Sequence, residues 1–129
     1  ANKNKYVSDT NGWYPNLNVV VRKNYFKDSN GDSIVLSGCK GGLAEYNTVA
    51  GSKLLVNAGA IHFAAIWPYT CTDTVFQYNE VYGIESGNGG DDLQAYDLDA
   101  SNYNCIYQYN YSHDNAGGFM LFCCLFLDR

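Results

Sequence analysis

Aspartate residues are concentrated in one short stretch of the sequence, from Gly90 to Asp99. If this stretch ends in a strand, side chains alternate between its two sides, so Leu98 points inward and Asp97 and Asp99 point outward together. Their Cα atoms then lie about 6.6 Å apart. Two carboxylates at this separation repel each other and push one pKa upward, which suits an acid/base pair. We therefore predict Asp97 and Asp99 as catalytic carboxylates.

The predicted separation lies near the range of roughly 5 to 9.5 Å that glycosidases use, but it does not distinguish retaining from inverting chemistry. Calcium binding is an alternative, because calcium prefers carboxylate and carbonyl oxygens and tolerates irregular loops. No EF-hand spacing is present, so the calcium prediction rests on composition alone. A solvated acidic face without chemistry is the third interpretation. The predicted calcium ligands are Asp91, Asp92, Asp97 and Asp99.

A histidine stands beside a carboxylate in the segment Ser112–Asn115. Such a histidine can act as a general acid or base near neutral pH, and we predict His113 as a third catalytic residue. The alternative is plain turn chemistry, in which Asp114 and Asn115 bond the local backbone. His62 stands in an apolar, strand-like segment and is expected to be a packed or structural histidine.

Aromatic side chains are abundant, with 12 Tyr and 2 Trp. Exposed rings stack on the faces of sugars, and nearby carboxylates accept hydrogen bonds from sugar hydroxyls. On this basis we predict Trp67, Tyr69 and Tyr96 as substrate-binding residues. The alternative is that most tyrosines stack on one another along a regular fold.

The sequence also contains a repeat that would position these candidates. Four short β-rich segments carry an Asn at one fixed place, and Gly-rich turns separate them from further strand-like segments. Stacked coils of this kind share one core, and their Asn side chains would form a ladder in which each amide bonds to the next coil. The pattern predicts an all-β parallel β-helix solenoid of about four to five coils. The repeated residues are Asn24, Asn47, Asn79 and Asn110.

The motifs NVVVRKNYF at 18–26 and IYQYNYSHDNAGGFML at 106–121 resemble the pectate-lyase-like superfamily, and the resemblance runs from about Leu17 to Phe122. It implies a right-handed parallel β-helix of the bacterial secreted type that acts on polysaccharide. The superfamily includes lyases, glycoside hydrolases, esterases, epimerases and non-catalytic fibres. Its enzymes usually have more coils and an N-terminal cap, and the Gly-His-Gly motif of its hydrolases is missing here. Residues 1–129 are accordingly expected to form one β-helix domain or a fragment of a longer solenoid.

Charge narrows the choice of function. The net charge is −5, and the stretch from Leu54 to Asp128 contains no Lys or Arg. Such a surface repels phosphate backbones, so we expect no nucleic-acid partner. Lyases of acidic sugars need a strong base and a cation for the substrate carboxylate, so hydrolysis of neutral sugar is favoured over β-elimination. No apolar run is long enough to cross a membrane, so no membrane partner is expected.

The five cysteines are expected to be buried structural thiols in preference to disulfides. Taken together, the sequence favours a secreted, carbohydrate-active module, but it leaves open whether the chain is an enzyme. One alternative is a calcium- or carbohydrate-binding module without turnover. Another is a structural solenoid whose open ends stack into a fibre.

Overall fold

The computed structural model describes residues 14–53, 61–87, 90–99 and 101–123. Every regular element in them is a short β-strand, and every strand pairing is parallel. No helix in these residues is long and apolar enough to cross a membrane. The strands are β1 (Asn16–Leu17), β2 (Val20–Arg22), β3 (Tyr25–Ser29), β4 (Ile34–Ser37), β5 (Cys39–Lys40), β6 (Leu43–Glu45), β7 (Thr48–Ser52), β8 (Ile61–Phe63), β9 (Ile66–Tyr69), β10 (Val75–Gln77), β11 (Glu80–Ile84), β12 (Gly90–Asp92), β13 (Tyr96–Leu98), β14 (Ile106–Gln108), β15 (Tyr111–His113) and β16 (Met120–Phe122).

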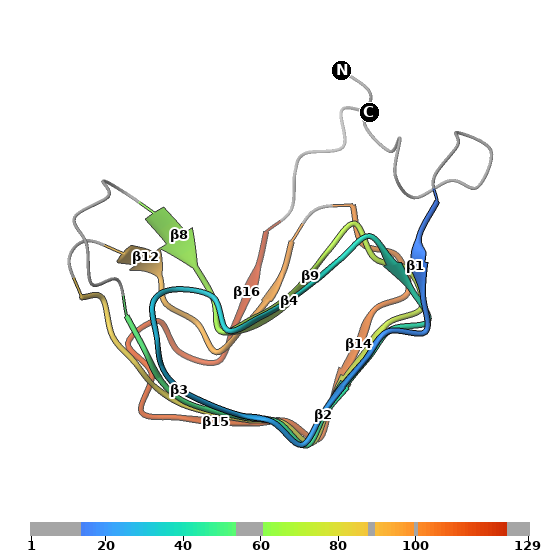
Figure 1. Cartoon of the computed structure of the whole chain (residues 1–129). Coiled ribbons are helices and arrows are strands. Elements are labelled where there is room, and N and C mark those ends of the chain that lie inside the picture. Colours follow the sequence, from blue (N-terminus) through green and yellow to red (C-terminus); the bar gives the residue numbers. More distant parts are fainter. Residues whose placement is uncertain (1–13, 54–60, 88–89, 100, 124–129) are drawn as a thin grey trace, which may run out of the picture.

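Three four-stranded sheets form the body of the structure. The first sheet has the order β14-β10-β6-β2, the second β15-β11-β7-β3 and the third β16-β13-β9-β4. Successive coils lie on top of one another, and the three sheets enclose the interior as the sides of a triangle (Figure 1). The prediction of an all-β parallel β-helix is therefore confirmed, with four coils represented in each of these sheets.

The Asn ladder lies at the corner between the first and second sheets. The side-chain amide of Asn24 donates to Asn47 at 3.0 Å, Asn47 donates to Asn79 at 3.0 Å, and Asn79 donates to Asn110 at 3.1 Å. The residue before each Asn has a left-handed backbone conformation, which turns the chain sharply from one sheet to the next. This turn aims every ladder Asn inward at the same level of its coil, so the predicted ladder is confirmed.

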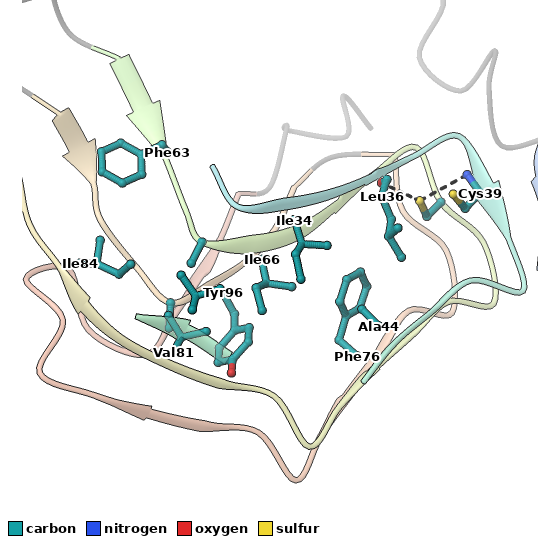
Figure 2. Close-up of a cluster of buried hydrophobic side chains, with 14 residues drawn as sticks. Ile34, Leu36, Cys39, Ala44, Phe63, Ile66, Phe76, Val81, Ile84 and Tyr96 are labelled. Carbon is teal, nitrogen blue, oxygen red and sulfur yellow. Dashed lines mark hydrogen bonds between the residues drawn. The ribbon is translucent and has the colours of Figure 1, made fainter. Parts of the chain in front are cut away.

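Apolar side chains from all three sheets meet inside the triangle (Figure 2). Phe76 of the first sheet, Val81 of the second and Ile66 of the third are fully buried. Cys39 and Cys71 are also buried, and the backbone N–H of Cys39 donates to the Cys71 sulfur at 3.4 Å. Both are free thiols, as are the other described cysteines, Cys105 and Cys123. Cys124 lies outside the described residues.

Candidate functional site

A small two-stranded sheet stands outside the triangle, near the corner between the second and third sheets (Figure 1). It consists of β8 and β12, and we call it the side sheet. Its register pairs Asp92 with Phe63, and Nδ1 of His62 lies 3.5 Å from Oδ2 of Asp92. Phe63 is buried, whereas the His62 side chain is 65% exposed. The prediction that His62 is packed is therefore wrong, because its strand belongs to the side sheet and presents this position to solvent.

The outer side of the third sheet carries two of the predicted sugar-binding rings. Trp67 and Tyr69 alternate with the buried Pro68 on β9, and their rings meet edge to face with centroids 6.2 Å apart. In the next coil, Tyr96 pairs with Ile66, and both side chains are buried. Since side chains alternate along a strand, Asp97 is directed to the outer side, as Trp67 is.

Asp97 is half-buried, and its Oδ1 atom is buried without a hydrogen-bond partner among the described residues. Burial is the main reason why the pKa of this carboxyl is raised to about 6. The negative charges of Asp99, Asp92 and Asp32 add to the effect. A hydrogen bond from the Leu98 backbone opposes it. Carboxylates from three segments of the chain therefore act on one carboxyl group.

Asp32 was not predicted as part of this group. It lies between β3 and β4, where its Oδ1 accepts hydrogen bonds from the Trp67 indole at 2.9 Å and from the Ala64 backbone at 3.2 Å. Burial raises the pKa of Asp32. The register of β4 and β9 could have revealed this contact. Ile34 pairs with Ile66 one coil later, and Asp32 and Ala64 each lie two residues earlier, so they are neighbours.

The backbone is strained where the side sheet ends. Asp92 and Leu93 are consecutive residues in the left-handed region, with φ values of 68° and 60°. Such a conformation costs about 1 to 3 kcal/mol for a non-glycine residue and is retained where neighbours enforce it. The Leu93 N–H donates to the Phe63 carbonyl at 3.1 Å, and the Gly117 N–H donates to the Leu93 carbonyl at 3.0 Å.

His113 does not join the aspartates. It lies on β15 of the second sheet, where its ring stacks on Tyr82 and contacts Asp114 Oδ2 at 2.9 Å and Glu80 Oε1 at 3.4 Å. The hydrogen bond to Asp114 is the main reason that its pKa is raised. The register pairs His113 with Tyr82 in the second sheet, whereas Asp97 lies on β13 of the third sheet, so the two predicted catalytic residues stand on different sheets.

Tyr96 is also placed differently from the prediction. Its ring is fully buried, and its hydroxyl donates to the Asn79 carbonyl at 3.0 Å. A sugar cannot reach this ring, so Tyr96 supports the site from the core.

The metal prediction has no direct support in the geometry. Among the His, Cys, Asp and Glu residues that the structure describes, no group of three or more is arranged to hold an ion. The side chain of Asp91 lies outside the described part. Calcium binding by Asp91, Asp92, Asp97 and Asp99 stays a prediction.

No protein-family model matches the sequence. The chain is similar to the lacto-N-biosidase of Bifidobacterium longum subsp. longum, with 37% identity over 122 residues. The match covers 85% of this chain but 7% of the length of that protein. A short segment of a much larger protein thus shares the sequence pattern of this β-helix.

Proposed function

We propose that this chain is a carbohydrate-active β-helix module that hydrolyses glycosidic bonds at the aspartates around Asp97. The observation that carries the proposal is the half-buried Asp97 carboxyl, whose pKa is raised to about 6 beside other carboxylates. Glycoside hydrolysis needs one carboxyl group that donates a proton and a second that is ionised. A raised pKa suits Asp97 to the role of proton donor.

Two residues are candidates for the ionised partner. Asp99 follows Asp97 two positions later on the same segment, and Asp92 approaches from the side sheet. Both raise the pKa of Asp97 through their charge. Asp92 also lies close to a second titratable side chain, since its Oδ2 is 3.5 Å from Nδ1 of His62.

The rings of Trp67 and Tyr69 would bind the sugar. Both lie on the outer side of the third sheet, as Asp97 does, and Tyr69 is 45% exposed. The bond from the Trp67 indole to Asp32 fixes the orientation of this ring before a ligand arrives. A neutral sugar is the expected substrate, because no Lys or Arg follows Lys53 until Arg129.

Similarity to a segment of a lacto-N-biosidase, a glycoside hydrolase, supports a carbohydrate substrate. Membership of the pectate-lyase-like superfamily, a polysaccharide partner and a secreted location are further parts of the proposal. Because the chain spans 7% of that relative, the activity of the relative as a whole is not transferred to it.

Calcium is the competing ligand for the same aspartates. The unpartnered Oδ1 of Asp97 is an oxygen of the type that calcium prefers. A bound cation would favour the ionised form of Asp97 and so remove the proton that hydrolysis needs. Proton donation by Asp97 and calcium binding at this oxygen therefore exclude each other. If calcium binds there, added calcium chloride should lower the rate of hydrolysis.

Hydrolysis can be tested with the purified chain and chromogenic glycosides, including p-nitrophenyl lacto-N-bioside, together with neutral polysaccharides. Asp97→Asn should lower kcat by about 100-fold or more, because it removes the proton donor. Asp73→Asn is the matched control. Asp73 is an exposed aspartate that accepts a hydrogen bond from Asn104 and does not belong to the proposed site. Sugar binding without turnover, lost in Trp67→Ala, would instead identify a binding module. Absence of both would contradict a carbohydrate-active role.

A further inference from the structure

A close contact joins the last described coil to the end of the side sheet. Gly117 lies between β15 and β16, and its backbone touches the backbone of Asp92 and Leu93 from the coil before. A Cβ atom at Gly117 would lie 1.9 Å from the Asp92 carbonyl oxygen and 2.5 Å from the Leu93 carbonyl carbon. Both atoms belong to the backbone, so a side chain at Gly117 cannot be accommodated unless the turn moves.

The turn that Gly117 touches contains two consecutive left-handed residues, Asp92 and Leu93. Aspartate tolerates the left-handed region because its short polar side chain bonds locally, but leucine does not, so residue 93 has no intrinsic reason to adopt this conformation. Two hydrogen bonds enforce it, one to the Phe63 carbonyl in the preceding coil and one from Gly117 in the following coil. The conformation of the turn is thus imposed by the coils on either side.

The same turn decides where the Asp92 carboxylate lies. This side chain is 32% exposed, and its Oδ2 lies 3.5 Å from Nδ1 of His62. A relaxed turn would redirect the Cα–Cβ bond of Asp92 and separate its carboxylate from His62.

We infer that Gly117 is a positioning residue, which holds the strained turn Asp92–Leu93 and thereby keeps the Asp92 carboxylate beside His62 and directed to the aspartates around Asp97. Its effect on activity rests on the proposed function, whereas its effect on the place of Asp92 does not.

The first test is a double-mutant cycle. Gly117→Ala should lower kcat for a chromogenic glycoside at least tenfold with little change in KM. In an Asp92→Asn background the same substitution should cause no further loss of kcat, while its loss of thermal stability should persist. An equal loss of kcat in both backgrounds would overturn the inference, because Gly117 would then act on the fold in general.

Gly118→Ala is the matched control. Gly118 has a φ of 91°, so alanine is strained there, but nothing lies within 4 Å of its added Cβ. This variant should lose stability and keep the wild-type kcat. A loss of kcat equal to that of Gly117→Ala would contradict the inference.

A second readout does not depend on turnover. The carboxyl ¹³C signal of Asp92 and the imidazole ¹⁵N signals of His62, recorded at one pH, should shift in Gly117→Ala and stay in place in Gly118→Ala. Unchanged signals in Gly117→Ala would overturn the inference even if the enzyme is active. If the wild type does not hydrolyse glycosides but the signals still shift in Gly117→Ala, the positioning role is upheld and the proposed function is rejected.

If Gly117→Ala does not fold, Leu93 offers an independent route to the same turn. Leu93→Val stays apolar but disfavours the left-handed region more strongly, so it should shift the signals of Asp92 and His62. Leu93→Asn, which tolerates this conformation, should leave them in place. The reverse order of these two variants would contradict the inference.

Discussion

The hydroxyl group of Tyr107 donates a hydrogen bond of 2.5 Å to the backbone carbonyl of Asp97. Tyr107 belongs to β14 of the first sheet, and its ring stacks on that of Phe76 with centroids 4.7 Å apart. The bond therefore crosses the interior of the triangle and ends at the strand that carries the proposed proton donor. The core fixes the backbone of Asp97 from the side opposite to the one where a sugar would bind.

Tyr107→Phe removes this bond and leaves the Asp97 carbonyl without its partner. The free energy of unfolding should decrease by about 1 to 2 kcal/mol, which is the usual cost of an unpaired buried acceptor. The kcat for hydrolysis should also fall, because Asp97 is held less firmly. Urea unfolding and steady-state kinetics measure the two effects. Tyr109→Phe, at an exposed position of the same segment, should change neither of them.

Activity should depend on pH through Asp97. Hydrolysis is expected to decrease as the pH rises past about 6, because Asp97 then loses the proton that it donates. Asp32→Asn removes a like charge and should move this midpoint to lower pH. A pH–rate profile of each variant measures the midpoint. A profile that is flat between pH 5 and pH 8 would exclude Asp97 as the proton donor.

The free energy of unfolding should also depend on pH through the Asp97 carboxyl. The pKa of Asp97 is about 6 in the folded chain and about 3.9 when unfolded, so the folded state retains a proton that the unfolded state has released. The contribution of Asp97 to stability is then lost as the pH rises from about 4 to about 6. Chemical unfolding across this window should show the decrease in the wild type and a smaller one in Asp97→Asn. An identical pH dependence in both proteins would contradict the raised pKa.

The orientation of Trp67 should depend on Asp32. Asp32→Ala removes the acceptor of the indole N–H, which frees the ring to adopt other rotamers. Sugar binding is expected to weaken about fivefold to tenfold, equivalent to the net value of about one hydrogen bond. Tryptophan fluorescence titration measures the affinity. Glu85→Ala, which removes an exposed carboxylate paired with Lys53, should bind sugar as the wild type does.

An internal Asn of the ladder and the Asn at its exposed end should differ in their effect on stability. Asn79 is buried, donates to the Ala44 carbonyl and to Asn110, and accepts from Asn47. Asn79→Ala leaves several of these groups unpaired and should cost about 3 kcal/mol or more. Asn24→Ala, at the exposed end of the described ladder, should cost about 1 kcal/mol or less. Urea unfolding compares the two, and equal losses would show that the ladder is not the source of stability.

The fold followed from the sequence because one residue type repeats at one structural position. Asn24, Asn47, Asn79 and Asn110 recur at the same place in four β-rich segments, and that repeat can be read from the sequence alone.

The neighbours of Asp97 were harder to predict. His62 looked buried because its segment is apolar, but the strand leaves the body of the helix and joins the side sheet. Asp32 was missed because its contact with Trp67 joins two coils at a turn. His113 was assigned to the site from its chemistry, although its register with Tyr82 determines a different sheet. Sequence periodicity predicts the register of the strands. It does not predict the paths of loops of unequal length, and these determine which side chains lie near one another outside the sheets.

The residues of the proposed site come from successive coils: Asp32 from the coil of β4, Trp67 from that of β9 and Asp97 from that of β13. Backbone pairing sets the rise between neighbouring coils at about 4.8 Å, whatever the length of the loops that join their strands. Insertions between strands can therefore remodel the rim of a binding surface and leave the axial steps between these side chains unchanged. Loops of this solenoid can therefore be exchanged in evolution while the distances between side chains of neighbouring coils stay the same.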